Sequence, residues 1–420
     1  MSDDVRQFLR RGSGSPKLSW GFEQVWRRSQ KLRVRRVVAG AATAVAVVAA
    51  TAVGVAALTS LRETGDRIAP SGEDRGAPLL EATWAEIPAA PIGGRYGHAA
   101  VWSGKEMIVW GGLPSGRDDH GGLRSGAAFD PLASTWRKLS DGPLEFGAGR
   151  TAVWTGDEML VWGGETGKDH RRPDNGAAYD PETNSWRELP RSPHWSLANH
   201  SAVWTGREMI VWGGVGMSRL GDAFDPTTGE WRTIALAPIQ GRWHHSAVWT
   251  GEEMIVWGGR VGDDLATDAA AYDPDSDSWR ELPPAPIFGR DIHAAVWTGE
   301  EMIVWGGWGA NTRRGLSDGA AYSPATDTWR RLPRAPIEYA VSETVGTWTG
   351  RDLIVVGRDG ALAAYSPEQN AWTTVPEPPS GAAEMPALVG ADDALILWGG
   401  IDLRSSEGDS NEGALLRFGE

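Results

Sequence analysis

A fifteen-residue phrase returns seven times along this chain, and that repetition constrains the fold more than any other feature. The best preserved copies read HSAVWTGEEMIVWGG or differ from it at a few positions. Copies spaced 42 to 52 residues apart indicate one supersecondary unit stacked on others of its kind, because a single unit cannot bury its own apolar face. The seven copies begin at His98, Arg150, His200, His245, His293, Thr344 and Pro386.

Each repeat predicts four short strands. The stretches AVWTG and EMIVWGG alternate around β-branched and aromatic residues, and the Thr-Gly pair between them is typical of a hairpin turn. After the double glycine comes a variable loop, then a third strand that ends in an aromatic residue before Asp-Pro or Ser-Pro. Proline cannot donate to a ladder, so this dipeptide marks a turn, and a Trp beyond it opens the fourth strand. These fourth-strand residues are Trp136, Trp186, Trp231, Trp279, Trp329 and Trp372.

A double glycine after an apolar strand, followed at fixed spacing by an aromatic residue and a Trp, resembles the Kelch repeat. The resemblance covers residues 82–420, and its motifs recur in register, which isolated glycine pairs would not do. One repeat departs from the pattern, because Val356, Gly357 and Arg358 replace Trp-Gly-Gly. The resemblance implies an all-β fold, a seven-bladed β-propeller with blades packed around a central channel.

The count of fourth strands predicts how the ring closes. The last repeat runs to the end of the chain without a fourth-strand Trp, whereas Trp84 stands alone upstream of the first repeat. We therefore expect residues 82–88 to form the outer strand of the last blade, which removes two exposed sheet edges. Of the 24 Trp residues, 19 occupy repeated positions, and we expect these to pack between blades rather than to hold a cofactor.

The first 81 residues differ in composition from the repeats. Residues 1–36 are basic, and residues 37–58 contain no charge, which predicts a transmembrane helix with its basic flank in the cytoplasm and the propeller outside. Residues 59–81 are polar and predict a flexible stalk. Two alternatives remain, a cleaved signal peptide that would release a secreted protein and a buried Ala-rich helix; the length of the basic and apolar stretches favours the anchor.

Composition excludes several classes of function. From residue 79 onward 28 Lys and Arg face 48 Asp and Glu, a net charge of −20 that argues against a nucleic-acid partner. The absence of Cys excludes disulfides, thiolate metal sites and a copper cofactor built on a Tyr–Cys cross-link. An exported chain without Cys, with 36 Arg against 5 Lys, is typical of a bacterial protein.

The first group of candidate ligand-binding residues precedes the first strand of each blade, where propeller geometry predicts the mouth of the channel. Arginine and histidine there can hold a carboxylate, phosphate or sulfate through charge-assisted hydrogen bonds. Each side chain can also bond the backbone of its neighbour, and because the pattern repeats blade by blade we favour that structural role. The group consists of Arg95, His98, Arg150, His200, Arg242, His245, Arg290 and His293.

The second group breaks the repeat. Flat aromatic rings beside polar groups suit stacking on sugars, although packing within the loops explains them equally well. This candidate patch consists of His194, Trp195, Trp243, His244 and Trp308. Two variable loops also carry possible metal ligands without a diagnostic spacing, so we expect no metal or other cofactor. Those residues are Asp118, Asp119, His120, Asp169 and His170.

Three interpretations of function follow. The first, which we favour, is a membrane-tethered, non-catalytic binding module for a glycan or protein ligand, an expectation that rests on fold analogy. The second is a carbohydrate-active enzyme of sialidase-like or sugar-epimerase-like type, using arginines at the channel mouth with an acid such as Glu343. It is disfavoured because the sialidase Asp-box is absent and the Asp-Pro motif looks like a Kelch turn. The third is a transmembrane sensor with residues 1–36 as its cytoplasmic output.

Overall fold

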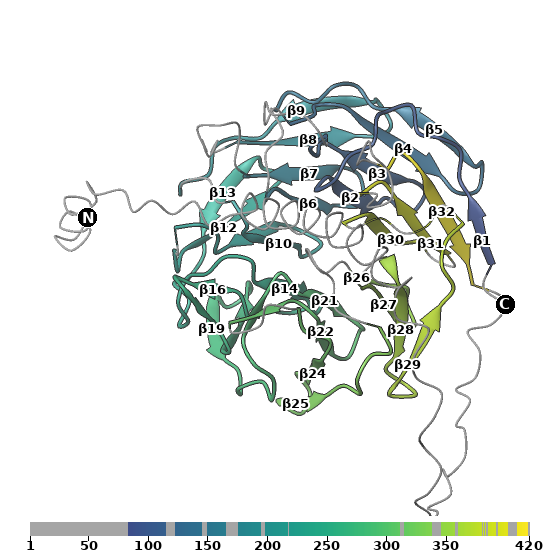
Figure 1. Cartoon of the computed structure of the whole chain (residues 1–420). Coiled ribbons are helices and arrows are strands. Elements are labelled where there is room, and N and C mark those ends of the chain that lie inside the picture. Colours follow the sequence, from purple (N-terminus) through teal and green to yellow (C-terminus); the bar gives the residue numbers. More distant parts are fainter. Residues whose placement is uncertain are drawn as a thin grey trace, which may run out of the picture. The chain divides into compact units, whose positions relative to one another are not determined.

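The computed structural model describes most of the repeat region, and its regular elements are strands (Figure 1). The described residues are 83–114, 122–144, 149–164, 175–194, 198–216, 218–310, 315–337, 346–357, 360–379, 381, 383, 385–391, 394–401 and 410–418. They form seven four-stranded antiparallel sheets and two short ladders. The predicted segments 1–36, 37–58 and 59–81 lie outside these residues. Within the described ranges no helix is both long and apolar enough to cross a bilayer.

The two inner strands of every blade come from the repeated phrase. The innermost strands are β2 (Ala99–Trp102), β6 (Thr151–Trp154), β10 (Ser201–Trp204), β14 (Ser246–Trp249), β21 (Ala294–Trp297), β26 (Gly346–Trp348) and β30 (Ala387–Ala391). The second strands are β3 (Met107–Trp110), β7 (Met159–Trp162), β11 (Met209–Trp212), β15 (Met254–Trp257), β22 (Met302–Trp305), β27 (Leu353–Val356) and β31 (Ala394–Trp398). Every residue of the second strands is buried, as a strand covered on both faces requires.

The two outer strands flank the Asp-Pro or Ser-Pro turn. The third strands are β4 (Gly126–Asp130), β8 (Gly176–Asp180), β12 (Gly221–Asp225), β18 (Ala269–Asp273), β24 (Gly319–Ser323), β28 (Leu362–Ser366) and β32 (Gly413–Arg417). The outermost strands are β5 (Thr135–Lys138), β9 (Ser185–Glu188), β13 (Glu230–Thr233), β19 (Ser278–Glu281), β25 (Thr328–Arg331), β29 (Ala371–Val375) and β1 (Thr83–Glu86). We number the blades 1 to 7 by their innermost strands in chain order.

The blades form a closed ring. Each innermost strand contacts that of the next blade, from β2 through β6, β10, β14, β21 and β26 to β30, and β30 contacts β2 again (Figure 1). The seven-bladed all-β propeller predicted from the sequence is therefore confirmed.

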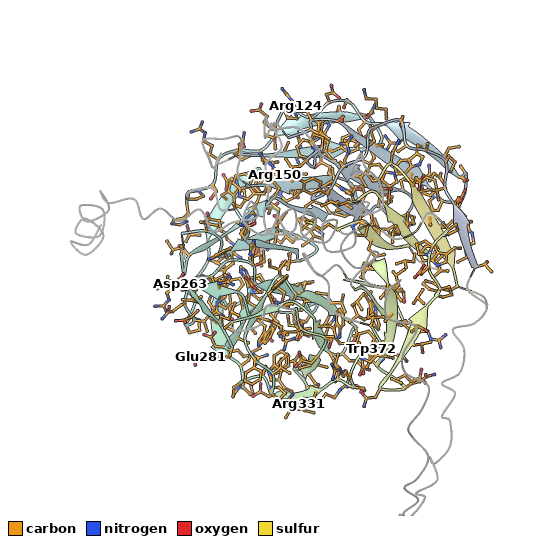
Figure 2. All side chains as sticks on the ribbon, in the orientation of Figure 1. Arg124, Arg150, Asp263, Glu281, Arg331 and Trp372 are labelled. Atoms are coloured by element: carbon orange, nitrogen blue, oxygen red, sulfur yellow. The ribbon has the colours of Figure 1, made fainter. Side chains whose placement is uncertain are left out.

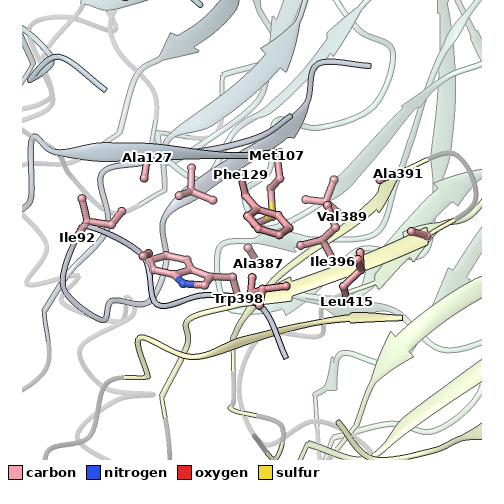
Figure 3. Close-up of a cluster of buried hydrophobic side chains, with 14 residues drawn as sticks. Ile92, Met107, Ala127, Phe129, Ala387, Val389, Ala391, Ile396, Trp398 and Leu415 are labelled. Carbon is pink, nitrogen blue, oxygen red and sulfur yellow. The ribbon is translucent and has the colours of Figure 1, made fainter. Parts of the chain in front are cut away.

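The ring closes through the strand predicted at residues 82–88. Strand β1 pairs antiparallel with β32, with Trp84 opposite Leu416, so the last blade takes its outer strand from the beginning of the domain. A buried cluster joins the first and last blades (Figure 3). In it Met107 and Phe129 of blade 1 pack with Ile396 and Trp398 of blade 7. The closure prediction is confirmed.

The repeated Trp residues hold neighbouring blades together. The six second-strand indoles are at most 2% exposed. The outermost-strand indoles each donate their N–H to a carbonyl in the segment that follows the preceding blade. The seven bonds are Trp84 to Pro376, Trp136 to Pro88, Trp186 to Ser140, Trp231 to Pro190, Trp279 to Ala235, Trp329 to Pro283 and Trp372 to Pro333. Because a buried indole needs an acceptor, this register explains the fixed Trp spacing and confirms the predicted packing role.

The two faces of the ring are built differently. On the turn face, the Thr-Gly turns and the proline turns are satisfied locally. For example, Thr250 Oγ1 accepts the N–H of Glu253, and Asp273 Oδ1 accepts the N–H of Asp275. On the opposite loop face, blades 4 and 5 carry two extra ladders. They are β16 (Arg260–Val261) with β17 (Asp264–Leu265), and β20 (Arg290–Asp291) with β23 (Trp308–Gly309).

Candidate functional site

The repeated arginines on the loop face are structural cross-links. Arg95 is 1% exposed, and its Nη1 donates to the carbonyls of Gly111 and Ser125, both at 2.9 Å. These carbonyls belong to the loop between the second and third strands of the same blade. One guanidinium therefore joins the segment that leads into blade 1 to the loop that crosses it.

Arg242 and Arg290 make the same connection in blades 4 and 5, and each adds an ion pair. Both are 0% exposed. Arg242 Nη1 lies 2.7 Å from Asp268 Oδ1, and Arg290 Nη2 lies 2.9 Å from Asp318 Oδ1. Their donors are directed into their own blades, so the structural role that the repetition favours agrees with this geometry.

The repeated histidines connect each blade to the one before it. The Nε2 atoms of His200, His245 and His293 lie 2.8 Å from hydroxyls on the preceding innermost strand, those of Thr151, Ser201 and Ser246 respectively. His245 and His293 also set their ring edges against Trp212 and Trp257. Burial lowers the pKa of His293 to about 3, with the charge of Arg290 acting in the same direction. The His293 imidazole is therefore neutral at pH 7 and joins the two blades through its hydrogen bond.

Two positions depart from this scheme. The ring centres of His98 and Trp398 lie 5.3 Å apart in an edge-on arrangement. The position of blade 7 that corresponds to Ser246, opposite the second-strand Trp, is Ala387, which has no hydroxyl. Neither ring nitrogen of His98 has a hydrogen-bond partner among the described residues. Arg150 occupies the histidine position of blade 2, where burial lowers the pKa of its guanidinium to about 10. Figure 2 labels Arg150 in the interior of the ring, whereas Arg331 and Glu281 lie at its margin.

The residues just before these histidines link blades 3, 4 and 5 through backbone hydrogen bonds. The N–H of His244 donates to the carbonyl of Asn199, and the N–H of Ile292 donates to the carbonyl of His244. All three residues have positive φ, +57° at Asn199, +55° at His244 and +54° at Ile292. Glycine adopts this conformation freely at Gly97 of blade 1, but the β-branched Ile292 adopts it at a cost of about 1–2 kcal/mol. The backbone bonds hold it there.

A polar and aromatic cluster lies on the loop face where blades 4 and 5 meet. Trp243 pairs with Arg260 in an antiparallel bridge, and the guanidinium of Arg260 lies 5.9 Å from the centre of the Trp243 ring. The ring of His244 packs 4.4 Å from that of Trp243. Burial and the charge of Arg260 lower the pKa of His244 to about 3, so this imidazole is neutral at pH 7.

An ion pair between the two blades completes the cluster. Arg260 Nε of blade 4 donates to Asp291 Oδ2 of blade 5, and Asp291 lies opposite Trp308 in the β20–β23 ladder. The Asp291 side chain is 4% exposed, and burial raises its pKa while Arg260 opposes that rise. The Arg260 side chain is 30% exposed. We call Trp243, His244, Arg260, Asp291 and Trp308 the blade 4–5 cluster.

The structure brings part of the sequence-predicted patch together and separates the rest. Trp243, His244 and Trp308 belong to the blade 4–5 cluster, whereas His194 lies between blades 2 and 3. Trp195 is outside the described residues. The same holds for Glu343 and the possible metal ligands Asp118, Asp119, His120, Asp169 and His170. In the described part of the chain, no three His, Asp or Glu side chains are arranged to hold a metal ion.

Arg260 and Asp291 were missed from the sequence, although both break the repeat. Asp291 stands where other blades have Tyr96, Ala198 and Trp243. Arg260 follows the double glycine, where blades 1 and 3 have Leu113 and Val215. Aligning the repeats position by position would have identified both.

A second departure lies between blades 2 and 3. His194 Nδ1 lies 2.7 Å from Asp222 Oδ1, and Ser192 donates its hydroxyl to Asp222 Oδ2. The next interface has Ile239 and Ala270 at the positions of His194 and Asp222, packed in one apolar cluster. A buried, hydrogen-bonded acid and a histidine have replaced an apolar contact here.

Two grooves open on the turn face, of about 770 Å³ between blades 3 and 4 and about 920 Å³ between blades 5 and 6. Repeated residues line them, and in each groove a repeated arginine pairs with a repeated glutamate. In the first groove Arg232 binds Glu208, with Nε 3.0 Å from Oε2, and Arg232 Nη1 donates to the hydroxyl of Tyr272. We attribute these grooves to the blade geometry and place the candidate site on the loop face.

Comparison with known proteins agrees with this architecture. A family model described as the KLHDC2/KLHL20/DRC7 Kelch-repeats domain matches residues 149–357. Those residues form a Kelch-repeat domain. They run from the start of blade 2 into blade 6, so the blade 4–5 cluster lies within the Kelch domain. The family resemblance predicted from the sequence is confirmed.

A solved structure is similar in fold to most of the propeller. The solved structure "Structure of YjhT" superposes with a TM-score of 0.56 at 16% identity, covering 69% of this chain and 99% of that one. At that identity the likeness concerns the fold alone. No curated protein sequence matches the chain. A Kelch propeller is consistent with a binding module.

Proposed function

We propose that this protein is a membrane-tethered, non-catalytic binding module whose Kelch propeller holds a glycan on the blade 4–5 cluster. The observation that carries the proposal is the composition of that cluster. Two partly exposed indoles, an arginine and a buried aspartate from neighbouring blades meet at positions where the repeat is broken. Repetition accounts for the buried Trp, Arg and His residues elsewhere on the loop face but not for these.

The chemistry of the cluster suits a sugar. An indole face packs against the C–H face of a pyranose ring, and a guanidinium beside it donates to ring hydroxyls. Arg260 is oriented by Asp291 through Nε, and no described residue accepts a hydrogen bond from its terminal nitrogens. A rigid arginine loses little conformational entropy when it binds, and this favours recognition of a small polar ligand.

The tether is proposed from the sequence. Residues 37–58 are uncharged and long enough to cross a bilayer, and the basic residues before them favour a cytoplasmic N-terminus. The propeller would then be displayed outside the cell membrane, where a glycan ligand would be met. Export after signal cleavage would leave the same site in a secreted protein.

A glycan-array assay on the purified full-length chain tests the proposal. We expect binding to one glycan class, weakened about tenfold or more by Trp243→Ala or Trp308→Ala. Leu132→Ala is the matched control, because Leu132 is an apolar side chain, 86% exposed, on the turn face. Binding that survives both Trp changes would move the site elsewhere. An array without any binding, with a protein captured instead, would replace the glycan by a protein ligand.

A further inference from the structure

Three described arginines on the loop face of blades 4 and 5 are paired with aspartates. The pairs are Arg242 with Asp268, Arg290 with Asp318 and Arg260 with Asp291. Arg242 and Arg290 are 0% exposed, so a ligand cannot reach them. Within the blade 4–5 cluster Arg260 is partly exposed, and Asp291 balances its charge.

Two further aspartates make the region acidic. Asp263 and Asp264 lie at the tip and on the second strand of the β16–β17 hairpin that carries Arg260, and both are exposed (Figure 2). Neither forms an ion pair with another described residue. Among the described residues of the blade 4–5 cluster and of the hairpin that carries Arg260, one arginine therefore lies with three aspartates, because His244 is neutral at pH 7.

The ion pair also leaves one acceptor unused. Asp291 Oδ1 is buried and accepts no hydrogen bond from any described residue. Because that oxygen is buried, a ligand would meet the ion pair through Arg260, whose side chain is 30% exposed. A hydroxyl can accept from the guanidinium and donate to a carboxylate, whereas an ionised carboxylate or a sulfate ester can only accept.

From these observations, and resting on the proposed glycan site, we propose that the blade 4–5 cluster selects uncharged, hydroxyl-rich sugars and rejects anionic ones. An anionic group placed on Arg260 would lie beside Asp291 and would have to break or share a buried ion pair. The propeller adds a repulsive background, since residues from 79 onward carry a net charge of −20.

The test compares matched glycans on the full-length protein. Each neutral hexose-terminated oligosaccharide is printed beside counterparts with a carboxylate or a sulfate on the terminal sugar. We expect the neutral members to bind at least about tenfold tighter, with little change in affinity between 50 and 500 mM NaCl. Preferred binding of the charged members, weakened by salt, would overturn the selectivity while leaving glycan binding intact. Failure of every glycan to bind would overturn the proposed function and the selectivity with it.

A charge variant tests which residue sets the selectivity. Asp291→Asn keeps the shape but removes the charge that balances Arg260, so we expect a gain of about tenfold or more in binding of carboxylated glycans. Asp318→Asn is the matched control, because it releases Arg290, which is fully buried, and should give no such gain. Thermal unfolding of both variants separates a folding defect from altered binding. A folded Asp291→Asn protein that still rejects anionic glycans would show that the pair does not set the selectivity.

Discussion

Arg242 and Arg260 lie on the same face of the same blade but in different chemical situations. Arg242 is fully buried, donates to two backbone carbonyls of its blade and recurs as Arg95 and Arg290. Arg260 is partly exposed, bonds an aspartate of the next blade and has no counterpart in the repeat. The difference teaches that residues which recur from blade to blade serve the fold, whereas residues that break the repeat are available to a ligand. Substitutions of recurring residues should therefore lower stability, whereas substitutions of residues that break the repeat should lower ligand affinity.

The largest expected effect is a loss of stability when a buried, recurring arginine is replaced. Arg242→Ala removes the donors that satisfy the carbonyls of Gly258 and Asp268 and leaves the Asp268 carboxylate unpaired. We expect a loss of about 3 kcal/mol in the free energy of unfolding, measured by urea denaturation. Arg331→Ala, at an exposed position of β25, should change it by no more than about 0.5 kcal/mol. Equal losses from the two changes would remove the distinction.

Low pH should also destabilise the folded propeller, because the recurring histidines are buried in their neutral form. The folded state holds the pKa of His293 at about 3, far below the value near 6.5 of an unfolded histidine. Between these values the unfolded state binds a proton that the folded state does not, so stability falls as pH drops from about 6.5 toward about 3. We expect a contribution of about 1 kcal/mol per pH unit, read from urea denaturation between pH 7 and 4.5. His293→Gln should reduce this slope, and an unchanged slope would contradict the burial argument.

A substitution beside one of the recurring histidines should give a smaller effect, a gain in stability. Ser201 and Ser246 supply the hydroxyls for His245 and His293, whereas Ala387 occupies the equivalent position at the seam where the ring closes. Ala387 lies opposite Trp398 in its blade, as Ser246 lies opposite Trp257. Ala387→Ser should therefore give His98 its missing partner and add about 1 kcal/mol of stability in thermal or urea unfolding.

The matched control is Ala387→Ser in a His98→Phe background, which lacks the ring nitrogens that the new hydroxyl would bond. There the change should give no gain. Stabilisation in both backgrounds, or in neither, would mean that the hydroxyl–histidine contact is not what distinguishes the seam from the other interfaces.

The fold could be predicted from the sequence because every blade solves the same packing problem with the same residues. Each outermost-strand Trp needs a carbonyl on the preceding blade, so Trp84, standing alone upstream, indicated where the ring closes. The site could be predicted only in part. Trp243 and Trp308 are visible as aromatic residues outside the repeat, but the bond between Arg260 and Asp291 joins two blades across 31 positions of the chain. Its partners are set by loop geometry, which the strand pattern does not encode.

The smallest expected effect concerns the edge of the binding surface. Phe288 is 82% exposed in the loop before blade 5, and its carbonyl, not its ring, accepts Nε of Arg290. Phe288→Ser should therefore change the unfolding free energy by no more than about 0.5 kcal/mol, since it removes no buried contact. If the ligand is confined to the blade 4–5 cluster, its affinity should also change less than about threefold, measured by titration calorimetry with a bound array glycan. A loss as large as that of Trp243→Ala would extend the binding site to this loop. Exposed aromatic residues, and not only the residues that break the repeat, would then contact the ligand.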